Sequence, residues 1–126
     1  AASDVYKRQL LYDLNSLSLI HKLSLPVTLV VLNNRGGGIF SFLPVSECRD
    51  IFETFWCASH SYNFENICRQ FSVRYERPNS CEEFERLYKE SFEFPGAVLI
   101  EVEIDRSATK WLHDRVKENV EKVLEQ

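Results

Sequence analysis

The chain has 126 residues, of which 44% are hydrophobic and 13% aromatic, and its net charge is −4. This composition indicates a single globular domain with a core and excludes an intrinsically disordered chain, a general nucleic-acid surface and a membrane-spanning segment. The cysteines include no Cys-x-x-Cys pair, so we expect reduced thiols in a cytoplasmic protein rather than a zinc site. They are Cys48, Cys57, Cys68 and Cys81.

Residues 1–9 are polar and show no periodic pattern. We interpret them as a non-matching N-terminal stretch, of the kind that an assembly or cloning scar leaves, and assign no element to them. The domain is expected over residues 10–126.

The first patterned segment pairs a helix with a strand. Leucines and an isoleucine between Leu10 and Ile20 recur at helical spacing, which predicts a helix. The run 27–32 is β-branched and apolar on both parities, which predicts a strand covered on both faces.

Further elements follow in alternation. Apolar spacing predicts short helices at 51–56 and 64–71, the second with Asn63 as its N-cap, and a short strand at 73–76. Ser80 and Glu83 form a capping box at the start of the next helix.

The last part of the chain predicts one more strand and one more helix. The run 97–100 is apolar and then alternates as far as Ile104, and a final helix begins at about Ser107. Strands that alternate with helices predict an α/β fold, a parallel sheet with helices on both faces.

The segment Asn33–Pro44 is the candidate ligand site. It follows the most apolar run of the chain and holds three of the four glycines. In parallel sheets ligands bind beyond the carboxyl ends of strands, which is where this segment begins. Its pattern is neither a P-loop nor a dinucleotide fingerprint, so a glycine-rich turn without a ligand is the alternative.

The residue types in this segment suit a metal–diphosphate group. The amide oxygen of Asn34 and the carbonyl of Gly36 are hard donors of the kind that Mg²⁺ prefers, and Gly37 allows close backbone approach. An apolar wall would lie beside them, formed by Ile39, Phe40 and Leu43.

Several stretches together resemble one family, the thiamine-diphosphate-dependent synthases of menaquinone biosynthesis. They are Tyr12–Leu17, Leu25-Pro26, Val31–Pro44, Phe64-Glu65, Tyr75, Arg77-Pro78 and Val98–Val102. The resemblance implies an incomplete thiamine-diphosphate-binding domain, the C-terminal portion of its diphosphate- and Mg²⁺-binding type. It also implies that the pyrimidine-binding and middle domains lie outside this chain.

Within the family, the resemblance gives roles to the segment after the strand. Asn34 and Gly36 correspond to Mg²⁺ ligands, and cofactor-binding positions are Asn34, Gly36, Gly37, Ile39 and Phe40. Phe40 and Leu43 correspond to the wall near the substrate. The catalytic glutamate comes from the pyrimidine-binding domain, so the resemblance assigns no catalytic residue to this chain.

The intact enzyme that the resemblance implies decarboxylates 2-oxoglutarate and adds the resulting succinyl-semialdehyde carbanion to isochorismate. Thiamine diphosphate and Mg²⁺ are its cofactors, and it is a homo-oligomer. This chain alone is expected to be inactive.

One departure from the family pattern concerns the metal. The family's Gly-Asp motif, whose Asp is a metal ligand, falls by its spacing from Asp13 on Tyr6 and Lys7. Lys in place of Asp removes a carboxylate ligand and adds a positive charge beside a dication. A contact between unit charges near a protein surface is worth about 4 kcal/mol, and here its sign opposes metal binding.

Two other functions are compatible with the residues. One is a thiamine-diphosphate enzyme of the acetolactate-synthase type, against which the run Gly36–Pro44 argues. The other is a non-catalytic α/β interaction module, which the absent Gly-Asp favours. Arg35 stands where the family has a small or polar residue, and we expect its side chain to be solvated rather than bound to a phosphate or a substrate carboxylate.

Overall fold

The computed structural model of the chain describes residues 3–36, 38–57 and 59–124. The chain divides into two compact units. The sheet unit comprises Ala1–Asn33 and Ser61–Glu103, and the loop–helix unit comprises Asn34–His60 and Ile104–Gln126. Each unit is described by itself.

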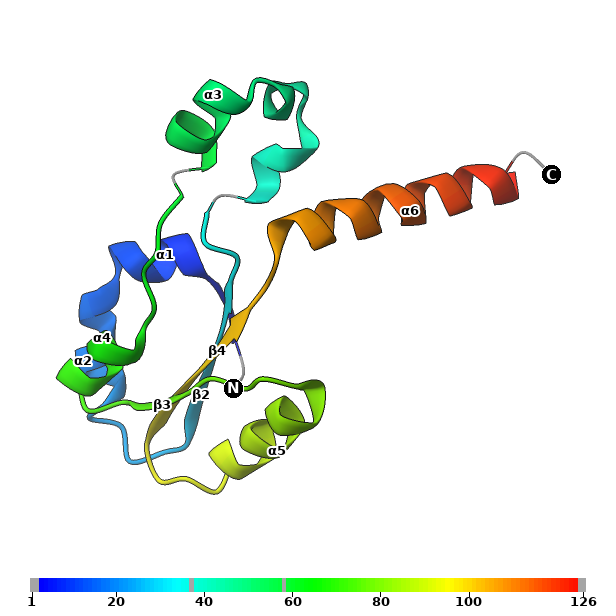
Figure 1. Cartoon of the computed structure of the whole chain (residues 1–126). Coiled ribbons are helices and arrows are strands. Elements are labelled where there is room, and N and C mark those ends of the chain that lie inside the picture. The colour runs from blue at the N-terminus through cyan, green and yellow to red at the C-terminus, as the bar shows by residue number, and fades with distance from the viewer. Residues whose placement is uncertain (1–2, 37, 58, 125–126) are drawn as a thin grey trace. The chain divides into compact units, whose positions relative to one another are not determined.

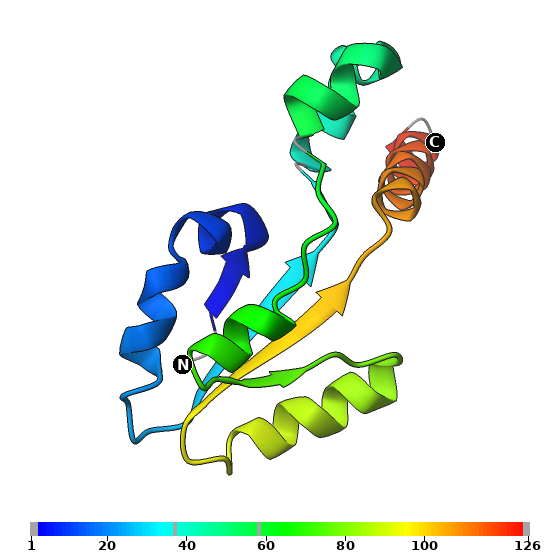
Figure 2. The ribbon, with the colours of Figure 1, turned by 60° about the vertical axis from the view of Figure 1, so that its left-hand side comes forward.

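The described residues of the sheet unit form a parallel sheet of four strands, in the order β1-β2-β4-β3 (Figure 2). These strands are β1 (Ser3–Tyr6), β2 (Val27–Asn33), β3 (Arg74–Glu76) and β4 (Ala97–Glu103). β2 and β4 are central, and their register runs from Val27 opposite Ala97 to Asn33 opposite Glu103. The predicted parallel α/β sheet is confirmed.

Helices cover both faces of this sheet, as predicted. They are α1 (Lys7–Tyr12), α2 (Leu17–Ile20), α4 (Glu65–Gln70) and α5 (Cys81–Ser91). Figure 1 shows α1, α2 and α4 on one side of the strands and α5 on the other. Because α1, α2 and α4 are each only four to six residues long, packing against the sheet rather than helix propensity keeps them formed.

The two faces of the sheet have separate cores. Odd-numbered strand positions such as Val31 and Leu99 pack with Leu17 and Phe64 on the side of α1, α2 and α4. Even-numbered positions face α5, where Leu87 packs with two strand residues, Val98 and Ile100. This alternation matters for the site, because it places the side chains of Asn33 and Glu101 on the first face.

The α5 helix begins as its sequence predicts. The Ser80 hydroxyl accepts a hydrogen bond from the Glu83 N–H at 3.1 Å, and the Glu83 carboxylate accepts one from the Asn79 N–H at 2.7 Å. The reach of Glu83 therefore extends one residue further back than in the standard capping box.

Two local expectations were wrong. The helix predicted from Leu10 to Ile20 is broken, because Asp13 takes a non-helical conformation and a short 3₁₀ turn, η1 (Leu14–Ser16), separates α1 from α2. The N-cap of α4 is Phe64 rather than Asn63. No side-chain cap forms from Phe64; instead its N–H donates to the buried Glu101 carboxylate.

The stretch 1–9, to which the sequence assigned no element, contributes the edge strand β1. Ser3 to Tyr6 pair with Leu29 to Leu32 of β2. Pairing in a sheet is made by backbone groups, so a segment without a side-chain pattern can still form a strand.

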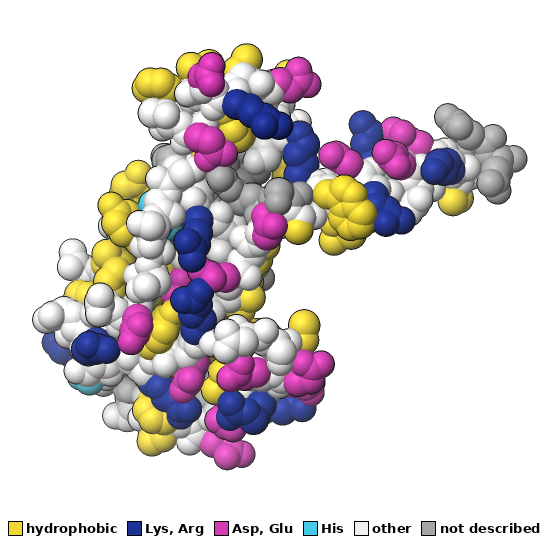
Figure 3. Space-filling view, in the orientation of Figure 1, with side chains coloured by type: hydrophobic (Ala, Val, Ile, Leu, Met, Phe, Trp, Pro, Cys, Tyr) yellow, Lys and Arg dark blue, Asp and Glu magenta, His cyan; other side chains and the backbone are white. Residues whose placement is uncertain are grey.

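The described residues of the loop–helix unit form short turns and one long helix. The turns are η2 (Gly38–Phe42), η3 (Pro44–Glu47), α3 (Arg49–Ile51) and a wide turn, η4 (Phe52–Cys57). The long helix is α6 (Arg106–Leu124), which confirms the predicted final helix. Its apolar side chains are exposed between charged ones (Figure 3), among them Trp111, Leu112, Val116, Val120 and Val123.

A search of the described helices for one long and apolar enough to cross a membrane finds no candidate.

Candidate functional site

The candidate site begins where β2 ends, at Asn33. Asn33 is the last residue of the central strand and lies opposite Glu103 of β4. On the other side, Tyr6 of β1 pairs with Leu32, so position 7 follows β1 at the edge of the sheet where β2 ends. In the chain, position 7 thus directly follows β1 and Asn34 directly follows β2, the strand with which β1 pairs.

Asn33 is held from inside the protein. Its side chain is 1% exposed, and its amide nitrogen donates to Oε1 of Glu101 at 2.5 Å and to the carbonyl of Tyr62 at 3.1 Å. An amide nitrogen carries two hydrogens, and these two acceptors use both. Asn33, the first of the two adjacent asparagines, thus has a structural role.

Glu101 is the acceptor around which three donors gather. It is fully buried, and its Oε2 accepts hydrogen bonds from the Phe64 N–H at 3.0 Å and the Tyr75 hydroxyl at 2.8 Å. With Asn33 on Oε1, the buried carboxylate has a donor at each oxygen, which is the condition for keeping such a group in a core.

Two neighbouring groups have pKa values that reflect this environment. Burial raises the pKa of the Cys68 thiol from 9.0 to about 12, and the negative charge of Glu101 adds to the rise. Burial is also the main cause that raises the pKa of Tyr75 above its ordinary value, and the hydrogen bond from Tyr75 to Glu101 is the second cause. Both groups therefore stay protonated at neutral pH.

The predicted metal ligands lie just beyond Asn33. Asn34 is half-buried, and its Oδ1 faces the N–H of the buried Gly36 at 3.4 Å. Between them, Arg35 adopts a left-handed conformation with φ 55°, and its carbonyl accepts a hydrogen bond from the His60 N–H at 3.2 Å. As predicted, the Arg35 side chain is exposed.

The predicted apolar wall is described only in part. Phe40 packs edge-to-face on Trp56, with ring centroids 5.5 Å apart, and Leu43 is 46% exposed. Gly37 and the side chain of Ile39 lie outside the described residues. The roles of the five predicted cofactor-binding residues and of Leu43 stay predictions.

The donor chemistry suits half of a Mg²⁺ site. Within residues 3–36, 38–57 and 59–124, no group of three or more His, Cys, Asp or Glu side chains could hold a metal ion. The predicted ligands are instead an amide oxygen and a backbone carbonyl, both of which Mg²⁺ accepts. The carboxylate that the family resemblance predicts beside them falls at position 7, where this chain has Lys.

The sequence did not reveal the role of Glu101. Polar and apolar residues alternate in the run Glu101-Val102-Glu103-Ile104, a pattern that gives Glu101 and Glu103 the same exposure. In the structure Glu101 is fully buried whereas Glu103 is exposed. The available signal was an acidic residue directly after four apolar residues of a strand expected to be covered on both faces. In such a strand a carboxylate requires buried donors.

The parallel sheet with helices on both faces, and a glycine-rich segment after the central strand β2, define a parallel α/β domain. Residues 9–102 match the family model of the thiamine pyrophosphate enzyme C-terminal TPP binding domain. The chain belongs to this family.

Curated relatives share one name. A 2-succinyl-5-enolpyruvyl-6-hydroxy-3-cyclohexene-1-carboxylate synthase from Chlorobium luteolum is 43% identical over 97 residues, which are 77% of this chain and 17% of the relative. The synthase of the same name from Salinibacter ruber is 36% identical over 115 residues, covering 91% of this chain and 19% of the relative. The chain thus spans less than a fifth of the length of either.

Solved structures share the fold. The thiamine diphosphate-dependent 4-hydroxybenzoylformate decarboxylase of Rhodococcus jostii superposes with a TM-score of 0.69 at 20% identity, covering 82% of this chain and 19% of that one. Benzoylformate decarboxylase from Polynucleobacter necessarius gives a TM-score of 0.66 at 15% identity, covering 83% and 19%. At this identity the likeness concerns the fold alone.

Proposed function

We propose that this chain forms the C-terminal, diphosphate-binding part of a synthase that couples decarboxylation of 2-oxoglutarate to carbon–carbon bond formation with isochorismate, in menaquinone biosynthesis. The observation that carries the proposal is the 43% identity to a synthase named for this product, over 77% of the chain. We call the longer polypeptide of which the chain would be part the intact enzyme.

The chain's own residues would bind and orient the cofactor. The Asn34 amide oxygen and the Gly36 carbonyl would hold Mg²⁺ against the diphosphate, where oxygen ligands suit this ion. Gly37 would let the backbone approach, and the side chains of Ile39 and Phe40 would exclude water from the reacting end. Leu43 would extend this apolar wall toward the substrate.

Thiamine diphosphate supplies, when bound, the electron sink for loss of CO₂ from a 2-oxo acid. The residue that activates it belongs to the pyrimidine-binding domain in the implied family, so this chain supplies an anchor and a wall rather than a catalytic acid or base. The proposal describes the intact enzyme as a cytoplasmic homo-oligomer with small-molecule substrates.

A calorimetric titration of thiamine diphosphate in the presence of Mg²⁺ tests the proposal. We expect no measurable binding to the 126-residue chain and Mg²⁺-dependent binding to the intact enzyme with Gly-Asp at positions 6 and 7. The intact enzyme should also release CO₂ from 2-oxoglutarate in step with isochorismate consumption.

An Asn34→Ala variant of the intact enzyme is the site control, and it should weaken Mg²⁺-dependent binding by about tenfold or more. Turnover of other 2-oxo acids without isochorismate would favour an acetolactate-type enzyme. An intact enzyme with Gly-Asp at positions 6 and 7 that binds no thiamine diphosphate would overturn the proposal in favour of a non-catalytic module.

A further inference from the structure

The buried carboxylate of Glu101 lies one residue away from the proposed ligand loop. Its Oε1 accepts the amide of Asn33 at 2.5 Å, and Asn34 is the next residue along the chain. Neither Glu101 nor Asn33 is accessible to a ligand, since they are 0% and 1% exposed. An effect of Glu101 on cofactor binding is therefore indirect, and Asn33 is the partner of Glu101 that lies next to the loop in the chain.

The Asn33 amide is fixed from two directions. One hydrogen goes to Glu101 on β4 and the other to the Tyr62 carbonyl, in the segment that leads into α4. Glu101 in turn holds that segment through the Phe64 N–H at 3.0 Å. One network of buried hydrogen bonds thus connects the end of β2, the start of α4 and β4.

The charge on Glu101 makes this arrangement directional. A carboxylate only accepts hydrogen bonds, and three donors converge on it, from Asn33, Phe64 and Tyr75. An Asn33 side chain turned by 180° would present its oxygen to two acceptors, so the contacts allow one orientation. The Asn33 side chain is consequently held in one orientation at the end of β2.

We infer that Glu101 is a positioning residue for the cofactor loop: by holding the Asn33 amide, it sets the conformation in which Asn34 and Gly36 are presented to Mg²⁺ and diphosphate. This inference rests on the proposed function. It assigns Glu101 no contact with cofactor or substrate.

The test uses Glu101→Gln in the intact enzyme with Gly-Asp at positions 6 and 7. Gln keeps the size and one acceptor oxygen but brings an NH₂ group, which meets a donor whichever way it turns. If the Gln oxygen keeps the hydrogen bonds from Phe64 and Tyr75, its NH₂ group faces the NH₂ group of Asn33, and the two donors cannot pair. We expect the dissociation constant of thiamine diphosphate with Mg²⁺ to rise by about tenfold to a hundredfold, the range typical of residues that orient a ligand-binding group.

A matched control separates positioning from general loss of stability. Thr28 lies at the other end of β2, and its hydroxyl is hydrogen-bonded to that of Ser91 at 2.6 Å in the other core. Thr28→Val breaks this buried pair without touching Asn33. It should lower the melting temperature, as Glu101→Gln does, and leave the dissociation constant unchanged.

A second variant covers the case in which Glu101→Gln does not fold. Asn33→Ser removes the linking amide and leaves Glu101 with Phe64 and Tyr75, and it should raise the dissociation constant to a similar extent. An unchanged dissociation constant in either folded variant overturns the positioning role. An intact enzyme with Gly-Asp at positions 6 and 7 that binds no thiamine diphosphate instead overturns the proposed function, and the positioning role with it.

Discussion

Asn33 and Glu101 are joined diagonally across the two central strands of the sheet. The register places Val31 opposite Glu101, and the Asn33 amide, two residues further along β2, donates back to Glu101 at 2.5 Å. This bond joins the last residue of β2 to a carboxylate that also accepts hydrogen bonds from the Phe64 N–H and the Tyr75 hydroxyl. The stability of the sheet unit therefore depends on the donors that surround Glu101.

Removing one of these donors should cost a measurable part of that stability. Tyr75→Phe deletes the hydroxyl that lies 2.8 Å from Glu101 and keeps the ring. Because a hydrogen bond to a charged group contributes about 1.5 kcal/mol or more, we expect the free energy of unfolding to fall by about that amount. Urea unfolding of the chain measures it. Tyr12→Phe, which removes a hydroxyl from a residue that is 80% exposed, is the control and should change little; equal losses in the two variants would contradict the prediction.

Stability should also decline in alkaline solution, with a contribution from Cys68. Its pKa is about 12 when folded and 9.0 in the ordinary thiol, so between these values the unfolded state binds fewer protons and rising pH favours unfolding. The stabilisation is complete below about pH 9 and is lost as the pH rises toward 12. Tyr75, with its raised pKa, acts in the same direction at higher pH.

Urea midpoints measured from neutral pH to about pH 11 test this dependence. Cys68→Ala should show a shallower decline than the wild type, although its absolute stability is lower because a buried side chain has been shortened. Cys48→Ala, which removes an exposed thiol, is the matched control. Parallel declines in the wild type and Cys68→Ala would count against the assignment.

The end of α4 offers a stabilising substitution. Ser72 is exposed and left-handed, with φ 54°, and Val73 donates back to the Cys68 carbonyl at 2.8 Å, as in a glycine-terminated helix end. Ser72→Gly removes a Cβ that this conformation disfavours, and the greater freedom of glycine when unfolded offsets part of the gain. We expect a rise in the free energy of unfolding of about 0.5–1 kcal/mol. Ser18→Gly, placed within α2, should instead lower it by a similar amount.

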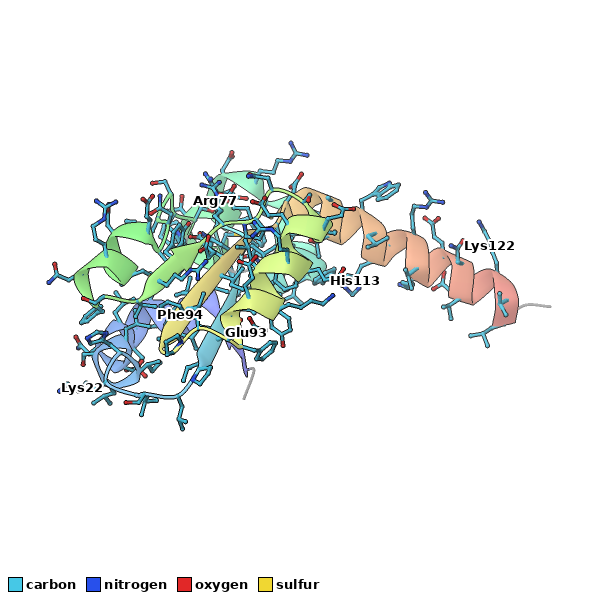
Figure 4. All side chains as sticks on the ribbon, turned by 90° about the horizontal axis from the view of Figure 1, so that it is seen from below. Lys22, Arg77, Glu93, Phe94, His113 and Lys122 are labelled. Atoms are coloured by element: carbon cyan, nitrogen blue, oxygen red, sulfur yellow. The ribbon has the colours of Figure 1, made fainter. Side chains whose placement is uncertain are left out.

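Restoring the acidic half of the metal motif should restore affinity for Mg²⁺. In the intact enzyme with this chain's own residues at positions 6 and 7, Tyr6→Gly with Lys7→Asp exchanges a positive charge for a carboxylate at the edge where β2 ends. Calorimetry should show Mg²⁺-dependent binding of thiamine diphosphate in the double variant and weak or no binding without it. Lys22→Asp makes the same change of charge in the turn after α2, where Lys22 projects outward (Figure 4), and should have no effect. Equal binding with and without the double change would show that position 7 is not a ligand position.

The sheet and its helices could be predicted because hydrophobic periodicity and turn chemistry agree along most of the chain. The apolar run 27–32 and the capping box at Ser80 define elements from local residues alone. Asp13, which ends α1, could not be predicted, since its effect depends on a non-helical backbone conformation that Asp tolerates but does not require. β1 carries no side-chain pattern, so it could be recognised only from its pairing with β2.

The candidate site divides in the same way. The position of the loop follows from the end of a buried strand and from the glycines, which are visible in the sequence. The hydrogen bond that holds Asn33 does not follow from the sequence, because Glu101 lies 68 residues from Asn33 and contacts it only when β4 pairs with β2. Non-local hydrogen bonds of this kind leave no periodic trace.

The two adjacent amides, Asn33 and Asn34, point to different tolerances under random mutagenesis. Every substitution at Asn33 disturbs the buried donors and acceptors around Glu101, so most library members changed at this position should lose stability. Asn34 is half-buried at the start of the loop, and its substitutions should weaken cofactor binding instead. Cofactor occupancy in these variants should recover when thiamine diphosphate and Mg²⁺ are in excess. One dipeptide would then report on two selections, in which stability counts at its first residue and ligand occupancy alone at its second.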